Sequence, residues 1–84
     1  MNKLKIIDLR TNGIVFIKVL EEVELIILRQ SPDLFFDSIW FEVNVQKEVI
    51  RENRSNYKMI VIDDYNNFIS GWPKARVISL EDYK

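Results

Sequence analysis

The chain contains neither cysteine nor histidine. Without cysteine, disulfides, thiolate nucleophiles, iron–sulfur clusters and cysteine-based zinc sites are excluded. Without histidine, the chain also lacks the side chain that titrates most readily near neutral pH and often ligates zinc. Catalysis on carboxylates, lysine, arginine, tyrosine or serine usually needs a larger scaffold than 84 residues. We therefore expect a protein that is not an enzyme and that holds no metal or other cofactor.

Long apolar runs are missing as well. The longest have four residues, as in Ile14 to Ile17 and Leu25 to Leu28, whereas a membrane-spanning helix needs about 20. No apolar run of signal-peptide length follows Lys3 and Lys5 near the N-terminus. These absences predict a cytoplasmic protein without a membrane partner. The formal charge of -1 creates no overall field that would attract nucleic acid.

The length of 84 residues predicts one small domain over residues 1–84. A domain of this size without disulfides or metal has a small margin of stability, so a homodimer is one expected way to increase it. Isoleucine, asparagine and lysine are frequent, whereas alanine occurs once, at Ala75. This usage is typical of AT-rich genes and would suit a bacterial or prophage accessory protein.

A hairpin signal opens the chain. Asn12-Gly13 separates two apolar runs, Leu4 to Arg10 and Ile14 to Leu20, and Asn-Gly favours a two-residue turn between antiparallel strands. The register implied by that turn gives the hairpin two apolar faces. One face carries Leu9, Phe16, Ile7 and Ile14, and the other carries Ile6, Val15, Ile17 and Val19. Such a strand pair is either central in a sandwich or barrel, or keeps one face for another chain.

The middle of the chain is compatible with both helix and strand. Residues 21–29 fit a helix by the charges at their ends and a strand by their alternating apolar residues, and strand is slightly favoured. Ser31-Pro32 is a helix-start signal, but from Ile39 to Val45 apolar residues alternate with largely polar ones, which is typical of a half-buried strand. We therefore expect only a short helix after Pro32. The alternative is one helix spanning about 32–52.

Further strands are expected over residues 57–62, 68–72 and 76–80, with turns at residues 63–67 and at Pro73-Lys74. Isoleucine occurs 12 times and valine 8 times, and β-branched residues favour strands. The sequence thus predicts a mainly β fold, a small antiparallel meander or barrel-like sheet of five to seven strands with one short helix. The longer helix over about 32–52 would instead give an α+β fold.

The leading functional hypothesis is a non-enzymatic protein–protein interaction or accessory module that binds another protein or a second copy of itself. In the predicted strand over 39–45, Trp40 lies opposite Ile39 and Phe41 and would face outwards. An outward tryptophan is a favoured interface anchor, although a helix or loop could equally cover it. The predicted interface consists of Trp40 and one face of the hairpin, namely Val15, Ile17 and Val19.

The alternative hypothesis is a β domain that binds single-stranded nucleic acid. Basic side chains that follow a phosphate backbone, together with aromatic rings on which bases stack, are the features that such binding needs. The residues proposed for it are Arg51, Arg54, Lys58, Lys74 and Arg76, with stacking on Tyr57 and Trp72. Glu48 and Glu52 lie in the same stretch and reduce its charge, so a protein partner is favoured over nucleic acid.

Overall fold

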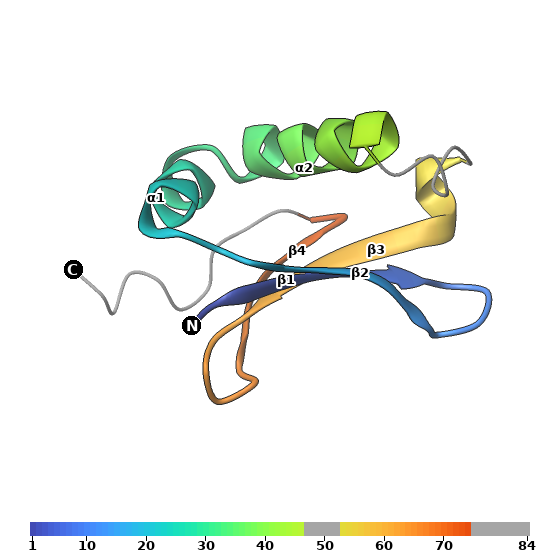
Figure 1. Ribbon diagram of the computed structural model, residues 1–84, viewed down its shortest axis with the longest axis horizontal. Helices are drawn as coiled ribbons and strands as arrows, with labels where there is room; N and C mark the ends of the chain where they lie inside the picture. The colour runs from blue at the N-terminus through green and yellow to red at the C-terminus, as the bar shows by residue number, and fades with distance from the viewer. Residues whose placement is uncertain (47–52, 75–84) are drawn as a thin grey trace.

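The computed structural model describes residues 1–46 and 53–74. Four strands form one antiparallel sheet in the order β2-β1-β3-β4. Two helices follow the first hairpin and precede the second (Figure 1). In chain order the elements are β1 (Lys3–Asp8), β2 (Ile14–Val19), α1 (Glu22–Gln30), α2 (Pro32–Gln46), the 3-10 helix η1 (Arg54–Asn56), β3 (Tyr57–Ile62) and β4 (Phe68–Trp72).

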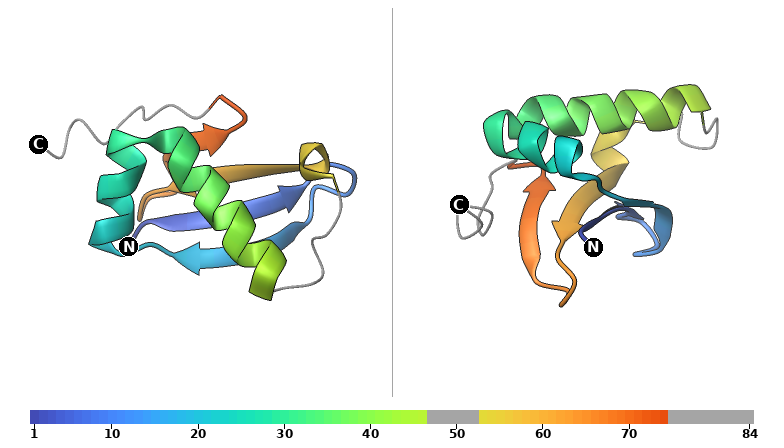
Figure 2. Two further views of the ribbon diagram at one scale, coloured as in Figure 1. Left: turned by 90° about the horizontal axis from the view of Figure 1, so that it is seen from above. Right: turned by 60° about the vertical axis from the view of Figure 1, so that its left-hand side comes forward.

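Both helices lie on the same face of the sheet (Figure 1). Seen from above, α2 crosses the strands obliquely and α1 lies near one end of them (Figure 2). The core lies between these two layers and draws side chains from both of them. Its buried residues are Leu4, Ile6, Leu20, Leu28, Phe35, Phe36, Ile39, Val43, Tyr57, Met59, Val61 and Ile69. The other face of the sheet is covered by neither helix.

The segment for which strand was slightly favoured, residues 21–29, is largely helix α1. The backbone N–H of Glu21 donates to Oε1 of Glu24 at 3.0 Å, and Arg29 lies in the last turn, where a cation meets the negative end of the helix dipole favourably. Leu28 is fully buried towards the sheet, whereas Val23 is 60% exposed. The end charges therefore predicted this element better than the alternating apolar residues did.

Helix α2 occupies the segment that was predicted as a strand over 39–45. Phe36, Ile39 and Val43, which are three and four residues apart, are all buried, as one face of a helix requires. Phe41 would share a face with Ile39 in a strand but is 58% exposed. The start of α2 at Pro32 confirms the helix-start signal, and the alternative helix over about 32–52 agrees with α2 as far as Gln46. Residues 47–52 lie outside the described residues.

The first hairpin is present, but its predicted register is wrong. Phe16 pairs with Ile6 rather than with Leu9, and the register shifts by one residue between Ile6 and Ile7. Phe16 therefore lies on the helix side with Ile6, while Ile7 shares the other face with Ile17. The predicted grouping of Phe16 with Ile7, and of Ile6 with Ile17, has to be corrected accordingly.

The cause of the register change is a connection longer than two residues, spanning residues 9–13. Asp8 closes it through its backbone, because its N–H donates to the carbonyl of Gly13 at 2.9 Å and its carbonyl accepts from the N–H of Asn12 at 2.7 Å. Asn12 has a φ of 61°, but Gly13 does not adopt a positive φ. A two-residue type I′ turn would need positive φ at both positions, so that turn is absent.

The predicted strands over 57–62 and 68–72 are confirmed as β3 and β4, with the turn between them. The predicted strand over 76–80 lies outside the described residues. The fold class nevertheless has to be corrected, because the described residues form a four-stranded antiparallel sheet with two helices, an α+β fold. Five to seven strands with one short helix are not found there. The prediction of a strand over 39–45 was wrong because the apolar residues there alternate as in a strand and also have the three- and four-residue spacing of a helix.

Candidate functional site

The face of the sheet that turns away from α1 and α2 is called here the open face. Its residues lie side by side across the strands, as the antiparallel pairing requires. From β2 to β4 the first row is Val19, Lys3, Ile62 and Phe68, and the second is Ile17, Lys5, Ile60 and Gly71. A third row joins Ile14, Ile7 and Lys58. The open face is therefore mostly aliphatic.

The most exposed aliphatic residues of the sheet lie on β2, which is an edge strand. Ile14, Val15, Ile17 and Val19 are 50%, 42%, 54% and 45% exposed. Three of them, Val15, Ile17 and Val19, are the hairpin residues that the sequence proposed for a protein interface. The structure brings these three together on one strand, and their role remains a prediction.

Three lysines occupy the middle of the open face. Lys3 and Lys5 project from β1, and Lys58 projects from the neighbouring strand β3 beside Ile7. No acidic residue stands in the three rows of the open face described above. This face therefore combines aliphatic surface with a local positive charge, although the whole chain has a formal charge of -1. Sequence reasoning missed Lys3 and Lys5, although their alternation with Leu4 and Ile6 could have placed them opposite the core.

Phe68 and Gly71 complete the open face at β4. A Cβ at position 71 would lie 3.0 Å from the carbonyl oxygen of Met59 and 3.0 Å from Cζ of Phe68. The ring of Phe68 thus lies against the backbone of Gly71, and only a residue without a side chain leaves room for it. Phe68 is itself 47% exposed. It is the single aromatic residue in the three rows of this face.

On the opposite side of β2, Lys18 ties the edge strand to both helices. Its Nζ lies 2.9 Å from Oε2 of Glu24 in α1 and 3.0 Å from Oε2 of Glu42 in α2. Partial burial by itself lowers the pKa of Lys18, but the hydrogen bonds to Glu24 and Glu42 outweigh it and hold this pKa above its ordinary value. Lys18 is therefore charged and paired, and it does not add to the positive charge of the open face.

Trp40 is placed differently from the other predicted interface residues. It lies in α2, packs half-buried against the core, and its ring centroid is 5.7 Å from that of Tyr57. The guanidinium of Arg54 lies 5.8 Å from the Trp40 ring centroid and 4.1 Å from that of Trp72. Trp40 is thus on the helix side of the sheet, separated from Ile17 and Val19 by the sheet itself.

Arg54 links these rings to α2 by a charged hydrogen bond. Its Nη1 donates to Oδ1 of Asp37 at 2.7 Å. Its Nε and Nη2 are buried and have no hydrogen-bond partner among the described residues. The guanidinium therefore combines the ion pair with Asp37 and cation–π contacts with Trp40 and Trp72.

The residues proposed for nucleic-acid binding do not form one surface. Arg54, Tyr57 and Trp72 lie on the helix side. There the ring of Trp72 contacts Arg54, and the ring of Tyr57 contacts Trp40. Lys58 projects from the open face, and Lys74 is exposed beyond β4. Arg51 and Arg76 lie outside the described residues. The described part of the set therefore splits between the two faces of the sheet.

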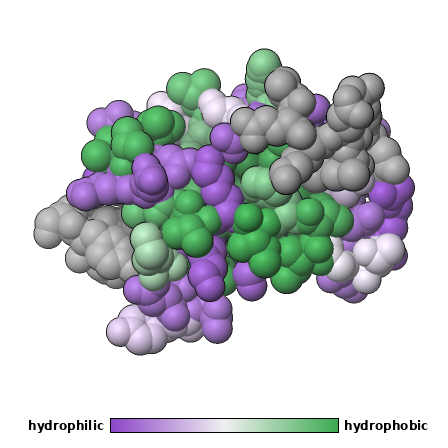
Figure 3. All heavy atoms as spheres, viewed as in Figure 1, coloured by the Kyte–Doolittle hydropathy of each residue, from purple (hydrophilic) through white to green (hydrophobic). Residues whose placement is uncertain are grey.

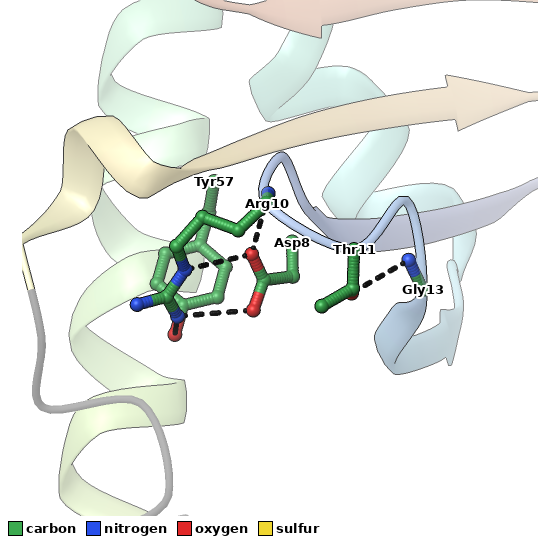
Figure 4. Close-up of polar contacts among 5 residues, drawn as sticks. All are labelled: Asp8, Arg10, Thr11, Gly13 and Tyr57. Atoms are coloured by element: carbon green, nitrogen blue, oxygen red, sulfur yellow. Dashed lines mark hydrogen bonds and ion pairs between the residues drawn. The ribbon is translucent and has the colours of Figure 1, made fainter.

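A polar cluster of Asp8, Arg10 and Tyr57 lies at the end of β1 (Figure 4). The guanidinium of Arg10 pairs with Asp8 through Nε to Oδ1 and Nη2 to Oδ2, both at 3.0 Å, and Nη2 also donates to the hydroxyl of Tyr57 at 3.2 Å. The Arg10 side chain, followed by its backbone N–H, holds the pKa of Asp8 below its ordinary value. The cluster joins the first hairpin to β3, and the side chains of Asp8, Arg10 and Tyr57 satisfy one another, so their positions are explained without a bound ligand.

The acidic side chains of the second hairpin serve its turn. Oδ1 of Asp63 accepts from the backbone N–H of Tyr65 at 2.8 Å and from that of Asn67 at 2.9 Å. Asp64 pairs with the N-terminal amine of Met1. No group of three or more acidic residues that could hold a metal ion is found among residues 1–46 and 53–74. The hydrogen bonds of Asp63 are those of an Asx-type turn.

In the described part of the chain, neither helix combines the length and the apolar character needed to cross a membrane. Comparison with family models, with curated proteins and with solved structures finds no match for this chain. The features left to indicate a function are the open face, the outer surface of the helices and the polar clusters around Lys18, Arg54 and Arg10.

Proposed function

We propose that the chain is a non-enzymatic protein-interaction module and that its binding surface is the open face, centred on Ile17 of β2. The observation that carries this proposal is the row of half-exposed aliphatic residues on β2, which no element among the described residues covers. When a partner removes the aliphatic surface of these neighbouring rows from water, the free energy of the complex is lowered. Val19 extends the same surface along the strand, and Val15, at the register shift, is exposed on that strand as well.

A protein partner fits this surface better than a nucleic acid does. Bases stack on aromatic rings, but Phe68 is the one aromatic residue in the three rows of the open face. The rings of Trp40, Tyr57 and Trp72 lie on the helix side and contact one another or Arg54. Branched aliphatic side chains pack well against other aliphatic side chains, and the lysines among them favour a partner that carries carboxylates.

The test compares two substitutions that add the same charge at different exposed positions. Ile17→Lys alters the open face, and Tyr65→Lys is the matched control at a residue 83% exposed in the turn after β3. Proteins that bind the tagged wild-type chain are identified, and one of them is purified and titrated against each variant by calorimetry. We expect binding at least tenfold weaker for Ile17→Lys and unchanged for Tyr65→Lys, with the far-ultraviolet circular dichroism of both unchanged.

Equal binding by Ile17→Lys and the wild type would refute the proposal. A titration with a single-stranded oligonucleotide at low salt accompanies it, because the lysines of the open face would also attract phosphate. Tight, salt-sensitive binding of the oligonucleotide that Lys5→Glu abolishes would assign the open face to nucleic acid instead. Trp40→Ala is not a suitable test of this surface, because Trp40 packs against the core.

A further inference from the structure

The outer surface of the helices is the second apolar surface of the molecule. On α1, Val23, Ile26 and Ile27 are 60%, 37% and 39% exposed, and on α2, Leu34 and Phe41 are 59% and 58% exposed. Figure 3 shows apolar spheres both over the helices and over the strands below them. The two layers of the fold therefore each present apolar groups to solvent, on opposite sides of the molecule.

The charges of this helical surface are opposite to those of the open face. Asp37 lies at helical spacing between Leu34 and Phe41 and pairs with Arg54, and Glu22 lies four residues before Ile26 at the start of α1. Glu21 and Asp33 are also exposed, and Arg29 is the one exposed base on the two helices among the described residues. The helical surface is thus aliphatic and acidic, while the open face is aliphatic and basic.

We infer that copies of this chain assemble head to tail, with the open face of one copy covering the outer helical surface of the next. The inference rests on the proposed function, because it assigns an occupant to the same open face. In this arrangement Lys3, Lys5 and Lys58 meet carboxylates, and the aliphatic residues of β2 meet those of α1 and α2. Charge and hydropathy are complementary between the two surfaces, as specific interfaces require.

Contact between two open faces is disfavoured by the same charges. It would bring the lysines of both copies close together, and the described rows contain no acidic residue that would neutralise their charges. A head-to-tail contact uses two different surfaces, so every added copy leaves one surface of each kind free. In an open chain of copies the mean mass rises steadily with concentration, whereas a rotation that closes a ring would give one fixed mass.

The experiment uses one variant for each surface. Ile17→Glu places an acid on the open face, and Phe41→Lys places a base on the helical surface, while Tyr65→Lys is again the control. Sedimentation velocity is measured over a range of concentrations up to millimolar, at low and high salt. We expect the wild type and the control to associate more strongly at low salt, and each of the two surface variants to remain monomeric.

Mixing the two surface variants provides the decisive measurement. Ile17→Glu keeps an intact helical surface and Phe41→Lys keeps an intact open face, so an equimolar mixture should form a one-to-one complex and nothing larger. Lys5→Glu and Leu34→Lys form a second pair, for use if either first variant loses its circular dichroism spectrum. A wild type that stays monomeric, or a closed dimer that persists in Phe41→Lys, would overturn the inference.

These outcomes separate the inference from the proposed function. If the wild type is monomeric but Ile17→Lys still loses a foreign protein partner, the head-to-tail assembly is wrong and the interaction module stands. If neither self-association nor a partner depends on Ile17, both are wrong.

Discussion

Replacing isoleucine by alanine on the two faces of the sheet should have very different effects on stability. Ile6 is completely buried beneath the helices, whereas Ile17 is 54% exposed on the open face. Truncating a fully buried isoleucine costs about 2–5 kcal/mol, because apolar burial is lost and a cavity remains. The same change at a half-exposed strand position costs about 1 kcal/mol or less.

These magnitudes are large compared with the whole stability of such a chain. At about 0.05–0.15 kcal/mol per residue, 84 residues correspond to an unfolding free energy of roughly 4–13 kcal/mol. Ile6→Ala should therefore remove roughly a quarter to a little over half of the free energy of unfolding in a chain near the middle of that range. Ile17→Ala should leave most of it intact.

Urea unfolding followed by tryptophan fluorescence measures both variants. Trp40 and Trp72 pack against the core, so their emission reports the separation of the helices from the sheet. The protein concentration is kept low, because self-association through the open face would stabilise the wild type more than Ile17→Ala. If Ile17→Ala lowers the unfolding free energy as much as Ile6→Ala does, then Ile17 is a core residue and the open face is not a free surface.

Three further predictions concern single contacts. Arg10 lowers the pKa of Asp8, so the stabilisation by the Asp8 carboxylate is present above about pH 4 and is lost as the pH falls through the lowered pKa. The urea midpoint of Asp8→Asn should therefore fall less steeply with acid than that of the wild type. Lys18→Met should lower the free energy of unfolding by about 1 kcal/mol at neutral pH, and the wild type should lose this contribution as the pH rises through the raised pKa of Lys18, above about pH 10. An unchanged denaturation curve at pH 7 would contradict the pairing with Glu24 and Glu42. Gly71→Ala should cost about 1–3 kcal/mol, visible as a lower melting temperature, because its Cβ would meet the carbonyl of Met59; a variant as stable as the wild type would show that β4 has room there.

Local signals in the sequence predicted those parts of the fold that depend on neighbouring residues. The limits of β3 and β4 follow from two short, mostly apolar runs on either side of a turn that Asp63 caps. The start of α2 follows from Pro32, whose fixed φ suits the first helical position. The exposed aliphatic surface on β2 follows from a strand pair that is apolar on both faces.

The errors occurred where two periods fitted the same residues. Between Ile39 and Val45 the apolar side chains satisfy both strand and helix spacing, and only the sheet beneath α2 makes Ile39 and Val43 the buried pair. The hairpin register likewise depends on the hydrogen bonds that Asp8 makes to Asn12 and Gly13, which an Asn-Gly signal alone does not specify. The partner of Phe16 is displaced by three residues, from Leu9 to Ile6, and a displacement by an odd number moves Phe16 from one face of the sheet to the other.

The sequence by itself determined that this chain has no cysteine or histidine chemistry, which residues form β3 and β4, and that β2 carries more aliphatic surface than one small core needs. Only the tertiary structure decided which side of the sheet each residue faces and which distant residues meet it. Lys5 and Lys58 lie one row apart on the open face because β1 pairs with β3, and Arg54 meets Trp40 and Trp72 because α2, which carries Trp40, packs against β4. Such contacts join residues far apart in the chain, and the free energy of burying the helices on the sheet outweighs the weak local preferences that a sequence displays.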